Sequence, residues 1–171
     1  MELPVDDALF FTQGLALHLI SIQAHILYLH SQSITSSMQF STINFLAVVL
    51  GTFANIAFGF LWYAPYVFGK SWQKHTGLTN EQLQRGSVIL KFGPAMVMIF
   101  IMGVVLAAYL PMGLNWEQGA FGGLLLGAGL AATSIGMHYL FAKRSVHLFL
   151  IDAGYIVVAM TIFGAIIAAM S

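Results

Sequence analysis

The stretch "VHLFLIDAGYIVVAMTIFGAIIAAM", residues 146–170, is apolar along nearly its whole length and contains one carboxylate, Asp152. As a helix it is long enough to cross about 30 Å of hydrocarbon. Inside lipid, each backbone N–H and C=O must find its partner within the segment, so such a run is expected to form a helix. This stretch therefore predicts a membrane-spanning helix, and it raises the question of what its carboxylate does.

The composition of the whole chain agrees with a membrane protein. Of 171 residues, 59% are hydrophobic and only 7% are charged, whereas a soluble domain carries about 25% charged residues. The formal net charge of zero gives no reason to expect the basic face that binds nucleic acid. From the apolar composition, the expected partner is the lipid bilayer. The absence of cysteine excludes disulfides, cysteine metal sites and thiol catalysis.

Apolar runs of spanning length recur along the chain. They cover residues 44–68, 87–110, 117–142 and 146–170. A polar loop separates the first two, and in it Thr79 followed by Gln82 predicts a short helix starting near Asn80. The turn at residues 143–145 is so short that the third and fourth spans should be antiparallel neighbours. We therefore expect an all-α polytopic protein with an antiparallel four-helix transmembrane bundle over residues 38–171.

The basic residues predict the orientation of this bundle. They are Lys70, Lys74, Arg85, Lys91, Lys143 and Arg144, and all of them flank the first long loop or the last turn. Because Lys and Arg are retained on the cytoplasmic side, loops 69–86 and 143–145 should be cytoplasmic and the C-terminus outside. The expected location is the cell membrane.

Residues 1–37 have a different pattern. His18, Ser21 and His25 form one polar stripe on an otherwise apolar segment, which is typical of a helix lying in the membrane interface. A marginal fifth span is the alternative. A natural beginning at Met38 is a third interpretation, in which the first 37 residues are an upstream reading of the start.

Polar residues of the predicted spans gather at one depth. At 1.5 Å per residue, Lys91 lies roughly 6 Å and Asp152 roughly 9 Å from the cytoplasmic ends of their spans. His138 is at a similar level. The expected polar layer consists of Asp152, Lys91, His138, Tyr155, Trp62 and Tyr63.

Two interpretations of this layer remain open. Charges inside a membrane normally face the bundle interior and form pairs. Asp152, adjusted by Lys91 and His138, could bind a proton, an ion or the amine of a solute during transport. Alternatively, Asp152 and Lys91 form an ion pair that holds the second and fourth spans together, with His138 hydrogen-bonded in the core.

Small residues predict the packed faces of the spans. Gly119, Gly123, Gly127 and Ala131 repeat every four residues in the third span, and Gly51 and Gly59 share a face of the first. Such stripes allow close approach of helix backbones. The stripe of the third span continues through Ser134 to His138, which places His138 on the packed side. The same stripe could support a homo-oligomer.

Signatures of catalysis are missing from the sequence. It contains no Gly-rich phosphate loop, nucleophile elbow or zinc-hydrolase histidine pair. We therefore expect no enzymatic activity, no cofactor and no metal site.

The string "GFLWYAPYVFGKSW", residues 59–72, is a more specific signal, together with "TGLTNEQL" and "LFLIDAGY". These motifs resemble a family of small bacterial and fungal membrane proteins catalogued as domain of unknown function 1761. The matching positions are Trp62, Tyr63, Pro65, Phe68, Gly69, Lys70 and Trp72. The resemblance covers residues 38–170 and implies a four-span membrane protein without implying an activity. In that family the position of Asp152 is commonly Asn, and the first 37 residues have no counterpart.

Two functions from different classes agree with the sequence. The first is a structural or accessory membrane module without catalytic activity. The alternative is a small-solute, ion or proton-coupled carrier or channel that uses the polar layer around Asp152, Lys91 and His138.

Overall fold

The computed structural model describes His18, residues 21–23 and residues 42–171, apart from the side chains of Val88 and Lys91. The chain divides into two units, residues 1–38 and 39–171. The predicted interfacial helix, the marginal fifth span and the start at Met38 concern residues that lie almost wholly outside the described ones. The four spans predicted from the sequence all belong to the second unit.

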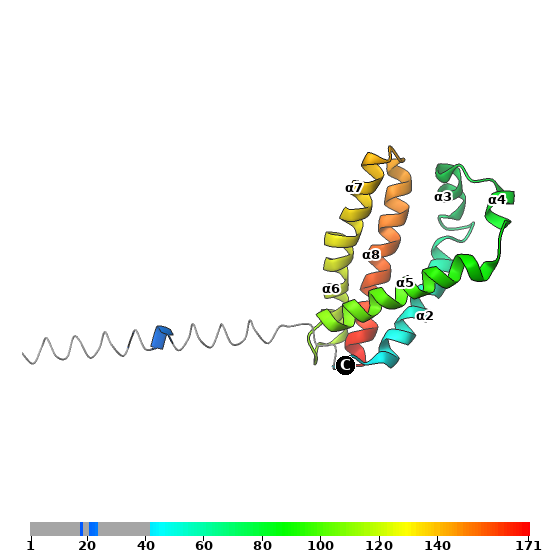
Figure 1. Cartoon of the computed structure of the whole chain (residues 1–171). Helices are drawn as coiled ribbons and strands as arrows, with labels where there is room; N and C mark the ends of the chain where they lie inside the picture. The colour runs from blue at the N-terminus through cyan, green and yellow to red at the C-terminus, as the bar shows by residue number, and fades with distance from the viewer. Residues whose placement is uncertain (1–17, 19–20, 24–41) are drawn as a thin grey trace, which may run out of the picture. The chain divides into compact units, whose positions relative to one another are not determined.

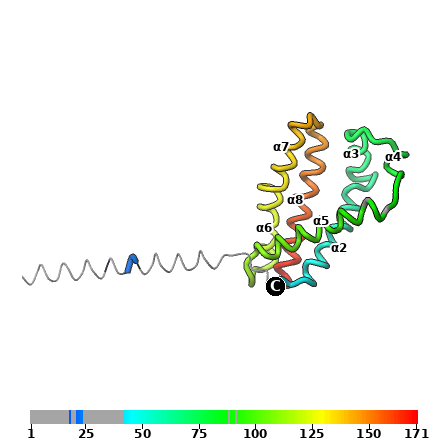
Figure 2. Tube along the Cα trace, in the orientation of Figure 1, coloured from blue at the N-terminus to red at the C-terminus, as the bar shows by residue number. Residues whose placement is uncertain are grey.

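This second unit is helical, and no strand occurs among the residues described. In chain order its elements are α2 (Phe45–Trp62), α3 (Gly69–Thr76), α4 (Asn80–Gln84), α5 (Val88–Tyr109), α6 (Trp116–Leu126), the π-helix η2 (Gly127–Ala132), α7 (Thr133–Phe141) and α8 (Val146–Ala169). Figure 1 shows their arrangement, and Figure 2 traces the same path of the chain.

Four helical segments are long and apolar enough to cross a membrane. They are Phe45–Trp62, Phe92–Tyr109, Trp116–Phe141 and Val146–Ala169. The prediction of an all-α polytopic membrane protein is therefore confirmed. Their large apolar side chains remain exposed on the outside, as with Leu125 and Phe141, which suits contact with lipid rather than water.

Side-chain caps start several helices, one of them where the sequence predicts. Thr79 and Gln82 form a reciprocal capping box at α4, as expected from their spacing. Asn115 and Gln118 form a second one at α6. Each box satisfies two backbone N–H groups that the first helical turn leaves without partners.

The first span is shorter than predicted, because α2 ends at Trp62 and not near residue 68. Pro65 disfavours helical geometry at the residue before it, and the chain turns through residues 63–68. Gly69 closes this turn by donating from its N–H to the Ala64 carbonyl at 3.0 Å. A Cβ at Gly69 would overlap the Tyr63 carbonyl, so the turn requires glycine at this position.

Helix α8 is central to the unit, since α2, α3, α5, α6, η2 and α7 all contact it. Helix α5 also contacts α2 and runs obliquely across the other helices in Figure 1. Helices α3 and α4 and the turn from α7 to α8 lie at the end of the unit opposite the C-terminus (Figure 1). We call this the basic end, because the Lys and Arg residues lie in or beside these segments.

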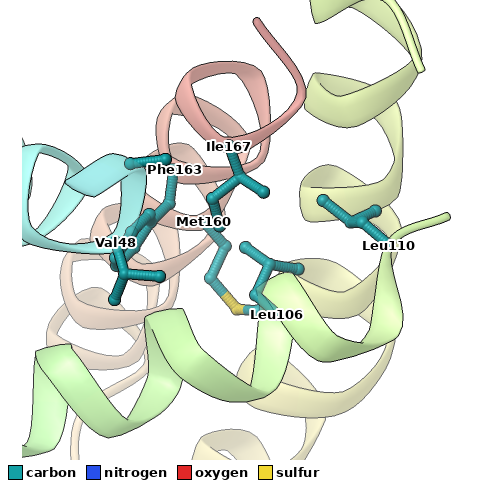
Figure 3. Packing of buried hydrophobic residues seen from close by; sticks show 7 residues of the cluster. Val48, Leu106, Leu110, Met160, Phe163 and Ile167 are labelled. Atoms are coloured by element: carbon teal, nitrogen blue, oxygen red, sulfur yellow. The ribbon is translucent and has the colours of Figure 1, made fainter. Parts of the chain in front are cut away.

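The core lies toward the other end, between α2, α5 and α8. Figure 3 shows Phe163 and Met160 of α8 between Val48 and Leu106. Phe163 is fully buried, and a Cβ at Gly51 of α2 or Gly103 of α5 would overlap its ring. These glycines therefore admit a large aromatic side chain between two helices.

The glycine stripe of the third span packs within the chain. A Cβ at Gly119 would overlap the Gly164 carbonyl of α8, and one at Gly123 would overlap the Met160 carbonyl. Gly127 lies similarly close to Val157. Backbone-to-backbone contact of this kind is how small residues join membrane helices. A homo-oligomer through the same stripe stays a prediction, and it would compete with α8 for this face.

Candidate functional site

The carboxylate of Asp152 in α8 is held by two tyrosines from other segments. Tyr63, which follows α2, donates from its hydroxyl to Oδ1 at 2.8 Å. Tyr139 of α7 donates to Oδ2 at 2.5 Å. Hydrogen bonds to a carboxylate are stronger than those between neutral groups, so this arrangement joins three segments at one point near the basic end.

Aromatic side chains surround this point. The Trp62 indole N–H donates to the Ile151 carbonyl at 3.1 Å. The rings of Tyr63 and Tyr155 are 5.3 Å apart between centroids, and Trp72 of α3 meets Tyr63 edge-on at 5.8 Å. These contacts pack aromatic side chains from α2, α3 and α8 around Asp152.

Tyr63 remains protonated in this environment. Burial raises the pKa of its phenol above the ordinary value, since it disfavours the charged form, and the hydrogen bond to Asp152 raises it further. Tyr63 lies just beyond the α2 span. It therefore acts as a hydrogen-bond donor to the carboxylate.

A pocket of about 920 Å³ opens beside Asp152 between α2, α3, α4, α5 and α8. Its polar groups come from Asp152 and Tyr155 of α8, from Tyr63 after α2, and from Lys70, Gln73, Asn80 and Gln84 of α3 and α4. Its walls are mainly apolar and include Ile56, Phe60, Phe92, Met96 and Ile99. Lys70 and Trp72 line it from α3. A ring stack of His75 on His147, with centroids 5.1 Å apart, joins α3 to α8.

The structure brings together Asp152, Tyr63, Tyr155 and Trp62 from the predicted polar layer. The side chain of Lys91 lies outside the described ones, so its ion pair with Asp152 stays a prediction. Within the described side chains, no basic group forms an ion pair with Asp152.

The packed position expected for His138 is wrong, because His138 is exposed. The residue that reaches α8 is its neighbour Tyr139, which the sequence reasoning missed. On α7, Gly136 and Tyr139 face Phe149 of α8. The packed face has thus moved by one residue relative to a regular α-helix.

The π-helix η2 causes this shift. A π-helical turn holds one residue more than an α-helical turn, and in an α-helix one residue corresponds to about 100° of rotation. Two hydroxyl groups support the wider turn: Thr133 donates to the Gly129 carbonyl and Ser134 to the Leu130 carbonyl, each at 2.6 Å. The string "GAGLAATS", residues 127–134, carries the glycines and hydroxyls that could have signalled it.

No group of three or more His, Cys, Asp or Glu side chains suited to a metal ion occurs in the described part of the chain. Asp152 has only tyrosines as its hydrogen-bond partners there. The chemistry that this arrangement offers is binding by charge and hydrogen bonds next to an apolar surface.

The sequence that forms this site is shared with a known family. A family model described as "Protein of unknown function (DUF1761)" matches residues 46–168. The chain belongs to this family. The match covers the four spans, Asp152 and its tyrosines, and it confirms the resemblance seen in the sequence motifs. No curated protein and no solved structure matches this chain.

Proposed function

We propose that this membrane protein is a carrier for a small solute, which binds in the pocket beside Asp152. The pocket is the observation on which the proposal depends. Ligand sites in proteins are mostly apolar cavities of about 300–1,000 Å³ with a few convergent polar groups. The volume of about 920 Å³ and the carboxylate at its wall agree with that description.

The position of the carboxylate also favours a carrier. Ionisable groups inside membrane spans are costly and usually mark a substrate or ion pathway. Asp152 belongs to the α8 span and lines the pocket. A solute bound in the pocket would therefore lie within reach of this carboxylate.

A structural or accessory module is the second candidate function, and a specific observation favours it. Both oxygens of Asp152 accept hydrogen bonds from tyrosines of other segments. The carboxylate could therefore serve to join α2, α7 and α8. In that case the pocket would be a space filled by lipid and closed to water.

Three further parts of the proposal come from the sequence. Loops 69–86 and 143–145 face the cytoplasm, and the C-terminus lies on the outer side of the cell membrane. The protein has no enzymatic activity. A homo-oligomer is also part of the proposal.

Single cysteines test whether water reaches the pocket, because the chain has none of its own. Ile99 lines the pocket, whereas Ile101 on the same helix is exposed on the apolar outside. In proteoliposomes, Ile99→Cys should react with N-ethylmaleimide at least tenfold faster than Ile101→Cys, since thiolate forms in water and not in lipid. Equal reaction rates of the two cysteine variants would overturn the proposal that this protein is a carrier.

Uptake into the same vesicles separates a carrier from a protein that only binds. The probes are benzyltrimethylammonium and benzenesulfonate, which carry permanent and opposite charges. One of them should enter faster than into protein-free vesicles, and the pocket-filling variant Ala95→Trp should abolish this uptake. Val97→Trp, on the exposed side of α5, is the matched control and should retain it. Uptake at the protein-free rate for both probes would argue for the structural module.

A further inference from the structure

We infer that the ligand of this pocket is an organic monocation, with one ammonium group on an apolar body of about the size of an aromatic ring. The inference rests on the proposed function, because it names the class of solute that the same pocket takes. Charge, hydrogen-bonding capacity and aromatic surroundings carry it.

The first argument is charge. Asp152 is the acidic residue among the described residues that line the pocket, and it is half-buried, whereas Lys70, the basic residue among them, is exposed, so solvent screens its charge. The remaining wall is mainly apolar, with Gln73, Asn80 and Gln84 as further polar side chains. In surroundings of low dielectric constant an attraction between opposite charges is several times stronger than in water. The pocket therefore favours a cation over a neutral or anionic solute of the same shape.

The second argument is the remaining capacity of the carboxylate. Each oxygen of an ionised carboxylate has two lone pairs, and each accepts one tyrosine hydrogen bond here. Among the described side chains only these two tyrosines donate to the carboxylate, so one acceptor position per oxygen is left there for a ligand. Because Tyr63 and Tyr139 approach from different segments, they hold the carboxylate in place while it binds.

The third argument is the aromatic wall. Tyr63, Tyr155 and Trp72 line the pocket together with the carboxylate, and the ring of Tyr63 lies next to both others. Cations bind to aromatic faces within about 6 Å of the ring centre, and ammonium groups are recognised in this way. A compact inorganic cation would have to lose its water to use these faces, whereas a substituted ammonium group is already weakly hydrated.

Lys70 limits the ligand to one positive charge. It lines the pocket from α3 and is exposed. A second cationic group on the ligand would meet a like charge there. The apolar walls formed by Phe60, Phe92 and Met96 instead accept a hydrocarbon or aromatic body.

An ammonium group could come from two sources, a free solute or the headgroup of a membrane lipid. Both share the chemistry that the pocket recognises. Binding measurements can separate them, because a lipid competes only from within a micelle or bilayer.

Equilibrium dialysis of the full chain in a non-ionic detergent tests the inference without requiring transport. At neutral pH the probes are benzyldimethylammonium, benzenesulfonate and benzyl alcohol, which share a ring and differ in the charge of the substituent. Benzyldimethylammonium, which has one N–H to donate to the carboxylate, should bind at least tenfold more tightly than the other two. Asp152→Asn should weaken its binding tenfold or more, whereas Asp152→Glu should retain most of it. Glu117→Gln, a change of an exposed carboxylate beyond the lining of this pocket, should have no effect.

Competition with phosphatidylethanolamine in mixed micelles then shows whether the ammonium group belongs to a free solute or to a lipid headgroup. Displacement of the labelled cation identifies a lipid headgroup, and lack of displacement identifies a free solute; both results agree with a cationic ligand. Equal binding of the anion, or unchanged cation binding in a folded Asp152→Asn variant, would overturn the inference. If benzenesulfonate binds and Ala95→Trp excludes it, the pocket remains a solute site and only the cation assignment fails.

Discussion

Tyr139 of α7 donates a hydrogen bond to Asp152 of α8 across 2.5 Å, and it reaches this position because the chain widens by one residue in η2. In an uninterrupted α-helix the side chain of Tyr139 would be rotated away by about 100°. The π-helix therefore decides which residue of α7 contacts the carboxylate. π-helical turns of this kind are frequent at functional sites.

Deletion of one residue from η2 should preserve this contact. Without Leu130, an exposed residue, the segment can form a regular α-helix that keeps α6 and α7 in their present orientations. We expect a change in the free energy of unfolding of less than about 1 kcal/mol. Insertion of one alanine after Leu130 should instead turn Tyr139 away and cost about 2 kcal/mol or more, since a bond to a charged group is lost. Thermal unfolding in detergent compares the two, and a more stable insertion variant would contradict the account of η2.

Substitution of Asp152 should affect stability according to its hydrogen-bonding capacity. Asp152→Asn keeps the shape and one oxygen acceptor, so folding should be largely intact. Asp152→Leu leaves two tyrosine hydroxyls without their acceptor and should destabilise the protein by about 3 kcal/mol, because half-buried donors lose their partners. Equal thermal shifts of the two variants would show that the tyrosine bonds do not support the fold.

Close packing of α6 on α8 predicts a large effect at Gly123. A Cβ there would overlap the Met160 carbonyl, so Gly123→Ala should separate the helices and cost about 1–3 kcal/mol. Gly93→Ala is the matched control, since no atom lies within 4 Å of the added Cβ. Chemical unfolding in mixed micelles would measure both. A neutral Gly123→Ala would mean that the two helices can separate at no cost.

The ion pair predicted between Lys91 and Asp152 calls for a double-variant cycle. Lys91→Gln and Asp152→Asn are measured singly and together by thermal unfolding. A pair between Lys91 and the half-buried Asp152 should give a coupling free energy of about 1 kcal/mol, which a folded Asp152→Asn variant can lose. Additive effects would show that Asp152 relies on Tyr63 and Tyr139 alone.

The fold class could be read from local patterns. Spans of about 20 apolar residues and the near absence of charge predict membrane helices, since lipid leaves the backbone no other partners. The capping box of Thr79 and Gln82 likewise depends on residues three apart, and it starts α4 as expected. The end of the first span was placed too late because its apolar composition continues past Pro65, while the backbone already turns there.

The candidate site could be predicted only in part. Asp152, Tyr63, Tyr155 and Trp62 were expected at one depth because depth depends on residue count along a helix. Tyr139 was missed in favour of His138, since the expected rotation of the third span assumed a regular helix. The pocket was also beyond sequence reasoning, because its walls come from five helices whose angles depend on packing.

By itself the sequence determined that this protein is an all-α membrane protein with four spans and that its basic residues flank the same two connections. These properties depend on apolar length and on charge, which neighbouring residues in the chain specify. Only the tertiary structure decided that Tyr63 and Tyr139 share the carboxylate of Asp152 and that a pocket opens beside it. The physical reason is that one additional residue in a helical turn rotates every side chain that follows it in the helix. This rotation decides which side chain contacts a neighbouring helix, and the neighbour is known only from the tertiary structure.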